Sequence, residues 1–145
     1  MIVTRLNGGL GNQLFQYAFG RYLATKHQTE LFLDARDYQK KPQHGLLLQH
    51  FNIDARFATN DILSKLPMIA YSQSWRRILW NASLSRPRWV REKPYGFRRE
   101  WKQIGSHAYL DGYWQSERFF SEIIPELRNQ LTLKTELSAL SQEIV

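Results

Sequence analysis

The sequence predicts an α/β fold in which a parallel sheet is flanked by helices. Two apolar runs, residues 2–6 and 31–34, have the character of strands, and the segment between them has a helical pattern from Leu10 to about Lys26. A strand, a helix and a strand within about 35 residues form a βαβ unit, whose strands are parallel. The length of 145 residues suits a single domain.

The first unit carries the clearest pattern. Asn7-Gly8-Gly9 ends the opening strand, because paired glycines adopt backbone angles that are closed to other residues. In the helix that follows, apolar residues recur every three or four positions, which predicts one buried face made of Leu14, Phe15, Ala18, Phe19, Tyr22 and Leu23. We expect the polar residues to lie largely on the other side, namely Gln13, Gln16, Arg21 and Lys26.

The middle of the chain gives weaker signals. Residues 38–49 are polar, contain Pro42 and Gly45, and are predicted to form a loop. A brief strand is expected at 51–55, a short helix at 60–66 that Pro67 ends, and a further strand at 68–71.

The last third is predicted in the same way. Residues 75–84 fit one basic helix, whereas Pro87, Pro94 and Gly96 argue against regular structure in much of the stretch after that helix. Residues 108–114 are expected to form a buried strand. Ser116 then caps a helix that Pro125 kinks or restarts, and residues 133–145 are helical in pattern.

Composition excludes several classes of protein. Residues are 43% hydrophobic and 23% charged, which is typical of a packed globular domain rather than a disordered chain. The absence of cysteine excludes disulfides, thiolate metal sites and a cysteine nucleophile, and the four histidines lack metal-ligand spacing, so no metal site is predicted. Neither a signal peptide nor an apolar membrane span is evident, so we expect a cytoplasmic protein.

The net charge of +7 is concentrated in one segment. Residues 75–102 hold nine Lys and Arg against Glu92 and Glu100, which accounts for the whole excess of positive charge. The same segment holds four of the five tryptophans.

The most specific motif is the glycine-rich run from Gly8 to Ala18. Its place between a strand and a helix directs free backbone N–H groups and the positive end of the helix dipole toward the edge of the sheet, which is anion-binding geometry. Asn12 and Gln13 both donate and accept hydrogen bonds and suit a hydroxyl-rich or phosphorylated ligand. A purely structural Gly-Gly turn explains the spacing equally well. The run lacks the features of a P-loop and of a dinucleotide-binding loop, which disfavours an ordinary ATPase or dehydrogenase.

Two motifs resemble those of the α-1,2-fucosyltransferases of glycosyltransferase family 11. The first spans residues 5–24, with the core Gly-Gly-Leu-Gly-Asn-Gln-Leu-Phe-Gln-Tyr, and the second is Asp111-Gly112-Tyr113-Trp114-Gln115-Ser116-Glu117. The spacing between them fits the family, so the resemblance covers essentially the whole chain.

The resemblance implies a two-lobed, glycosyltransferase-B-like enzyme with Rossmann-like lobes. Such an enzyme transfers L-fucose from GDP-fucose to the 2-hydroxyl of a galactoside with inversion, without a metal, in the synthesis of surface polysaccharide or O-antigen. The implied acceptor is a galactose-terminated glycan or a lipid-linked oligosaccharide. Asn12 is the leading candidate for donor binding, and the other matching positions are Arg5, Gly8, Gly9, Gly11 and Gln13.

One family signature is absent. The family binds the leaving diphosphate through His-x-Arg-Arg-x-Asp-Tyr, and none of His27, His44, His50 and His107 is followed two residues later by Arg. We therefore expect residues 1–145 to form the N-terminal, acceptor-side lobe, without the C-terminal GDP-fucose-binding lobe, and to be inactive or nearly so alone.

The catalytic base is left open. Asp34, Asp111 and Glu117 are candidates, but a cap, a turn and a first-turn acid explain them better. Tyr113, Trp114 and Gln115 could contact an acceptor sugar, although such an aromatic cluster more often belongs to a core.

Two other functions compete for the basic segment at 75–102. Its cations and aromatic rings suit a nucleic-acid-binding module, although no nucleic-acid-binding motif accompanies them, so nucleic acid is not the expected partner. The same cationic, aromatic surface suits peripheral attachment to the inner face of a membrane.

Overall fold

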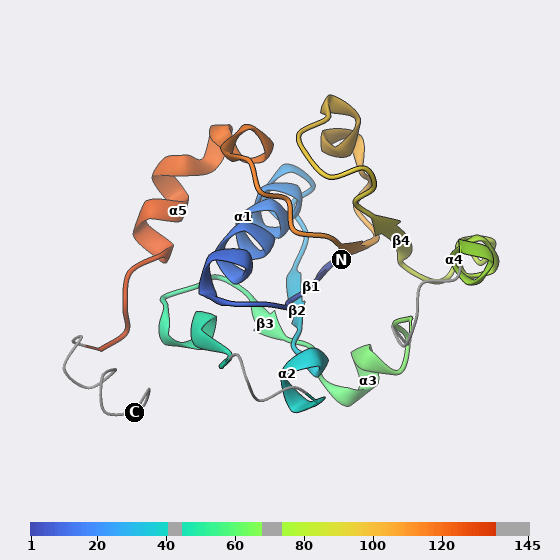
Figure 1. Ribbon diagram of the computed structural model, residues 1–145, viewed down its shortest axis with the longest axis horizontal. Helices are drawn as coiled ribbons and strands as arrows, with labels where there is room; N and C mark the ends of the chain where they lie inside the picture. Colours follow the sequence, from blue (N-terminus) through green and yellow to red (C-terminus); the bar gives the residue numbers. More distant parts are fainter. Residues whose placement is uncertain (41–44, 68–73, 136–145) are drawn as a thin grey trace.

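The structure, a computed structural model, describes residues 1–40, 45–67 and 74–135 (Figure 1). These residues contain one sheet of five parallel strands in the order β3-β2-β1-β5-β4. The strands are β1 (Ile2–Arg5), β2 (Leu31–Asp34), β3 (Arg56–Phe57), β4 (Arg88–Arg91) and β5 (Ala108–Asp111). The predicted α/β class, with a parallel sheet flanked by helices in a Rossmann-like lobe, is confirmed.

Helices and short 3₁₀ turns connect the strands. The longest helix, α1, spans Leu10–Lys26 and confirms the predicted bounds. The other helices are α2 (Arg36–Lys40), α3 (Asn60–Leu63), α4 (Ser74–Asn81) and α5 (Ile124–Gln130). The 3₁₀ turns are η1 (Leu47–His50), η2 (Arg99–Gln103), η3 (Glu117–Phe119) and η4 (Ser121–Ile123).

Apolar side chains cover both faces of the sheet. On one face, α1 and α5 pack over strand residues such as Ile2, Leu33 and Leu110 in the larger core cluster. On the other face lies a smaller cluster, which consists of Val3, Phe32, Leu66, Trp89 and Tyr109. The central strands β1, β2 and β5 are buried on both faces, so their apolar residues are consecutive rather than alternating.

The strand register places four charged residues at one edge of the sheet. Arg5 pairs in register with Asp34, and Arg91 pairs with Asp111. All four residues are the last of their strands, so the carboxyl edge runs in the order Asp34, Arg5, Asp111, Arg91, with alternating charge. After β1 the chain adds β2 and then β3 on one side of the sheet. It then crosses to the other side of β1, where β4 forms the outer strand and β5 lies between β4 and β1. The strand order therefore reverses between β1 and β5, where ligands bind in open α/β sheets.

Some predicted elements were wrong. The strand expected at 51–55 forms instead at Arg56–Phe57, and β4, between Pro87 and Pro94, was not predicted. The capped helix expected after Ser116 consists of η3 and η4, and α5 begins beside Pro125. The loop expected at 38–49 contains the end of α2 and most of η1.

Other predictions fall partly or wholly outside the described residues. The strand predicted at 68–71 and residues 136–145 of the final predicted helix lie there, and residues 133–135 are not helical. Within the part of the chain that the structure describes, no helix combines the length and apolarity needed to cross a membrane.

The basic segment at 75–102 divides into a buried and an exposed part. Trp89 belongs to the smaller core cluster, and Trp80 and Trp101 pack against the two clusters, so of the four tryptophans only Trp75 is largely exposed. This arrangement weakens the nucleic-acid alternative, which needs accessible rings for base stacking.

Candidate functional site

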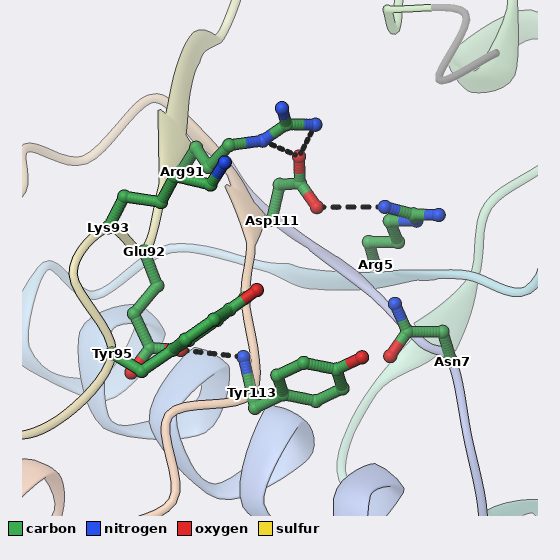
Figure 2. Close-up of a pocket in the computed structure, with 9 residues that line it drawn as sticks. Arg5, Asn7, Arg91, Glu92, Lys93, Tyr95, Asp111 and Tyr113 are labelled. Atoms are coloured by element: carbon green, nitrogen blue, oxygen red, sulfur yellow. Dashed lines mark hydrogen bonds and ion pairs between the residues drawn. The ribbon is translucent and has the colours of Figure 1, made fainter. Parts of the chain in front are cut away.

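A polar cavity of about 200 Å³ lies at the carboxyl edge, where the strand order reverses. Figure 2 shows its lining side chains arranged around Asp111. The lining residues come from the ends of β1, β4 and β5 and from the turns after these strands, namely Arg5, Asn7, Arg91, Glu92, Lys93, Tyr95, Asp111, Gly112 and Tyr113. Its position is the expected ligand position for this topology.

Asp111 lies between two arginines and orders one side of the cavity. Its Oδ1 accepts a hydrogen bond from Nη1 of Arg5 at 2.9 Å, and its Oδ2 lies 2.9 Å from Nε and 2.8 Å from Nη2 of Arg91. The indole of Trp89 also donates to Oδ2, at 3.1 Å. A buried carboxylate with this many donors fixes both guanidinium groups at the edge of the sheet.

Arg5 is held on its other side by Asp37 of α2. Nε and Nη2 of Arg5 donate to the same Asp37 oxygen at 3.1 and 2.7 Å. Burial of the guanidinium opposes its charge, but Asp111 and Asp37 together outweigh that effect and raise the pKa of Arg5. Arg5 therefore presents a fixed positive charge to the cavity.

A second buried carboxylate shapes the turn after β5. Oε2 of Glu92 accepts hydrogen bonds from the backbone N–H groups of Tyr113 and Trp114, at 2.7 and 2.8 Å. A Cβ added at Gly112 would lie 2.5 Å from Cβ of Glu92, so the turn fits only glycine at this contact. Glu92 thereby sets the position of Tyr113, whose ring lies 5.6 Å from that of Tyr95 (Figure 2).

The glycine-rich loop lies beside this cavity. Gly8 has φ of +76°, and its carbonyl accepts hydrogen bonds from Nε2 of Gln13 and from the hydroxyl of Tyr38, at 3.1 and 2.7 Å. Burial raises the pKa of Tyr38 to about 12, so the phenol stays protonated as a donor at neutral pH. Gly9 is the N-cap residue of α1, and no side chain caps the N–H groups of the first turn.

Gln13 and Gln16 are buried, and the prediction that they face outward was wrong. Nε2 of Gln13 also donates to the carbonyl of Gly45, and its Oε1 accepts from the N–H of Leu48. Gln16 exchanges two hydrogen bonds with Asn7 and donates to the carbonyl of Gly112 at 3.1 Å. These amides hold loops against the helix, because buried backbone groups need partners.

The two motifs of the sequence meet at Asn12. Nε2 of Gln115 donates to Oδ1 of Asn12 at 2.7 Å, and this hydrogen bond joins the turn of the first motif to the second. The bond leaves the amide nitrogen of Asn12 directed away from Gln115. Asn12 is half-buried and Gln115 is exposed, so both remain accessible to a ligand.

The structure places the predicted site residues in three settings. Arg5 and Tyr113 line the cavity. Gly8, Gly9, Gly11 and Asn12 form the adjacent loop and the first turn of α1, and Gln115 contacts that turn. Gln13 and Trp114 are fully buried. Trp114 packs 4.6 Å from the ring of Phe19, as the core alternative for the aromatic cluster expected.

The candidate bases are also placed. Asp34 is enclosed by Arg36 and Tyr109, and Asp111 is enclosed by Arg5 and Arg91. Glu117 is exposed and lines a separate apolar hollow between α1 and α5. Each of the two carboxylates that line the cavity, Glu92 and Asp111, already accepts several hydrogen bonds, so the described residues assign no base.

Sequence reasoning missed four cavity residues on or after β4. Arg91, Glu92, Lys93 and Tyr95 lie in the basic segment, for which no strand was predicted. A signal was present in the pattern Arg-Trp-Val-Arg, whose apolar centre has the composition of a short strand.

The cavity is suited to a small, hydroxylated ligand. Arginines and backbone groups supply fixed donors, and the two tyrosines supply both ring faces and hydroxyl groups. Among the described residues, no three His, Asp or Glu side chains gather as metal ligands.

Comparison with known proteins gives one relevant similarity. The chain is similar to the alpha-1,2-colitosyltransferase of Escherichia coli. The two are 35% identical over 136 residues, which make up 91% of this chain and 45% of that protein. The chain thus spans less than half the length of this relative. No protein-family model matches the chain, and neither does any solved structure.

Proposed function

We propose that this chain forms the acceptor-side lobe of an inverting α-1,2-glycosyltransferase. The enzyme transfers L-fucose, or its 3-deoxy analogue colitose, from a GDP-sugar to the 2-hydroxyl of a galactoside. A second, nucleotide-binding lobe completes it, and no metal takes part. L-Fucose is the donor sugar that the two sequence motifs favour, and colitose is the sugar named in the relative.

One observation carries this proposal. The hydrogen bond between Asn12 and Gln115 brings the two fucosyltransferase-like motifs together at the carboxyl edge of the sheet, beside the polar cavity. The 35% identity to a colitosyltransferase supports the same α-1,2 chemistry from an independent direction.

The geometry suggests a division of roles between residues of this chain. The cavity between Arg5 and Tyr113 has the size and polarity to hold the galactose ring of the acceptor. The uncapped first turn of α1 and the amide of Asn12 face the reacting sugar and the departing phosphate, where backbone donors stabilise developing negative charge. Asp111 and Glu92 position the arginines and Tyr113 and take no proton.

The two candidate donor sugars are distinguished by a single hydroxyl group. Colitose is L-fucose without its 3-hydroxyl, so the two GDP-sugars differ by one hydrogen-bonding group. A site built to hydrogen-bond a hydroxyl rejects the analogue lacking it by roughly 10⁴-fold, whereas an apolar pocket separates the two only weakly. The ratio of kcat/KM for GDP-fucose and GDP-colitose therefore identifies which donor the enzyme uses.

The test is a chimera with the Escherichia coli relative. The matched 136 residues of the colitosyltransferase are replaced by those of this chain, and transfer from each GDP-sugar to galactosides is followed by mass spectrometry, with and without EDTA. We expect an α-1,2-linked product whose formation EDTA does not affect. A folded chimera that transfers neither sugar contradicts the proposal.

A second experiment addresses the acceptor without the other lobe. Saturation-transfer NMR on the 145-residue chain with methyl β-galactoside is expected to show contact to the sugar. That contact should disappear in Tyr113→Ala and persist in Phe57→Ala, which changes an exposed ring on β3 at the opposite edge of the sheet. Equal signals from both variants would place the acceptor elsewhere.

A further inference from the structure

Helix α4 presents an apolar face to solvent. On its inner side, Nε1 of Trp80 donates to the carbonyl of Pro87 at 2.8 Å, and the amide of Asn81 bonds both backbone groups of Trp89. These contacts fix how the helix is rotated against β4. Figure 1 shows α4 at the periphery of the molecule, beside β4.

The outer face carries three large apolar side chains. Trp75, Ile78 and Leu79 are spaced by three and four residues, so they share one side of the helix. They are 55%, 68% and 64% exposed, and Leu84, in the turn after the helix, is fully exposed. An amphipathic helix normally turns such residues toward the core, so this exposed stripe marks a surface that binds something apolar.

Four arginines lie in this helix and in the residues that follow it, namely Arg76, Arg77, Arg86 and Arg88. Residues 74–91 contain no acid, and among the described residues none of the four arginines makes an ion pair. Arg76 and Arg86 lie over the rings of Trp75 and Trp80 instead, at 5.6 and 4.6 Å. The surface is therefore both apolar and strongly positive.

Two cations in the rest of the basic segment are neutralised by carboxylates. Arg91 is paired with Asp111, and Lys102 is paired with Glu122. Lys93, Arg98 and Arg99 are exposed but lie outside α4 and the turn after it. Residues 74–88, where the cations accompany the exposed apolar side chains of α4, are called the α4 patch.

We propose that the α4 patch docks on a membrane surface that carries anionic headgroups. Such a surface offers negative phosphates to the arginines and, a few ångströms deeper, hydrocarbon to Trp75, Ile78 and Leu79. Helix α4 lies at the periphery of the molecule, which suits shallow insertion into headgroups (Figure 1). No residue of α4 lines the cavity at the carboxyl edge, so the inference does not rest on the proposed enzymatic function.

The test is vesicle co-sedimentation of the 145-residue chain. Vesicles of phosphatidylcholine with phosphatidylglycerol are compared with vesicles of phosphatidylcholine alone, at low and high salt. We expect at least roughly tenfold tighter binding to the anionic vesicles at low salt, and most of it should be lost at high salt, because each arginine near the surface contributes electrostatically.

Variants separate the apolar and the charged contributions. Trp75→Ser/Ile78→Ser/Leu79→Ser should lower binding at least roughly tenfold, and Arg76→Gln/Arg77→Gln should weaken both the binding and its dependence on salt. Arg56→Gln/Phe57→Ser is the matched control, because it alters an exposed cation and an exposed ring on β3 at the opposite edge of the sheet. Circular dichroism confirms that each variant is folded.

Tryptophan fluorescence of the wild-type chain provides a second measurement of binding. Anionic vesicles should shift the emission to shorter wavelength, and Trp75→Phe should abolish the shift. The proposal is overturned if the chain ignores anionic vesicles at low salt or binds both vesicle types equally, and also if the triple serine variant binds like the wild type. Equally tight binding of single-stranded DNA would assign the α4 patch to nucleic acid instead and would likewise overturn it.

Discussion

Asn12 and Gln115 are 103 residues apart in the sequence and are joined by a side-chain hydrogen bond of 2.7 Å. Two further contacts tie the same segments together, because Gln16 bonds both Asn7 and the carbonyl of Gly112. The loop after β1 and the turn after β5 therefore form one polar unit. A substitution in either segment is therefore expected to shift the position of the other.

The first prediction concerns this pair. In the chimera, Asn12→Ala should lower kcat roughly 100-fold, as expected when a donor to a developing charge is removed. Gln115→Ala should cost less, since it removes only the group that orients Asn12. The double variant should be no worse than Asn12→Ala, because the two residues act as a unit.

Stability serves as the control for that experiment. The hydrogen bond is accessible to water, so each single variant should lower the free energy of unfolding by about 1 kcal/mol or less, measured by urea denaturation. An unchanged rate in Asn12→Ala would remove this residue from the site.

The second prediction concerns Asp111. Asp111→Asn leaves Arg5 and Arg91 at the carboxyl edge without their shared counter-charge, and should lower the free energy of unfolding by about 3 kcal/mol. Asp37→Asn is the matched control, because the Asp37 side chain is 32% exposed and its pair with Arg5 is screened by water. That variant should cost about 1 kcal/mol or less. Equal losses in the two variants would show that Asp111 does not organise this edge.

The third prediction compares two glycines of the same loop. Gly8 has a positive φ, and an added Cβ would lie 2.3 Å from Nδ2 of Asn12, so Gly8→Ala should destabilise the chain by about 1–2 kcal/mol. Gly11 lies in the first turn of α1 with open space around it, and Gly11→Ala should stabilise the chain by about 0.5–1 kcal/mol.

Activity in the chimera should separate these effects. If the backbone at Gly11 approaches the donor, as we propose, Gly11→Ala raises the melting temperature and lowers the transfer rate at once. A Gly11→Ala chimera with full activity would show that the ligand does not approach this turn.

The βαβ unit and the bounds of α1 were predictable from sequence because local periodicity determines them. The burial of Gln13 and Gln16 was not, since it depends on carbonyls at Gly45 and Gly112 that lie 32 and 96 residues away. Nothing in the local pattern distinguishes these amides from exposed ones. Hydrogen bonds to distant segments, rather than the helical periodicity, therefore determine that these two side chains are buried.

The same reason explains why four of the nine lining residues of the cavity were missed. β4 is four residues long and bounded by arginines, and it exists as a strand because it pairs with β5. Short strands of this kind have little intrinsic preference and depend on their neighbours. Arg5 and Tyr113 were found because they lie in recognisable motifs, whereas Glu92 and Tyr95 entered the site only through that pairing.

The last prediction concerns acid stability and Asp34. Burial of this carboxylate opposes its charge, but hydrogen bonds from Arg36 and Tyr109 outweigh that effect and lower its pKa below the ordinary value of 3.8. A lowered folded-state pKa stabilises the fold above the unfolded value, and this contribution is lost as the pH falls through the folded value. The free energy of unfolding should therefore decline on acidification below about pH 5.

Asp34→Asn isolates the contribution of this carboxylate. The variant should be less stable than the wild type at pH 7 and should lose less stability between about pH 7 and pH 3, measured by urea denaturation across that range. Asp61→Asn is the control, because Asp61 is exposed and its side chain makes no ion pair with any described residue. If Asp34→Asn and the wild type declined in parallel with pH, the carboxylate between Arg36 and Tyr109 would contribute nothing to acid unfolding. In that case the alternating charges along the carboxyl edge would position side chains without contributing to acid stability.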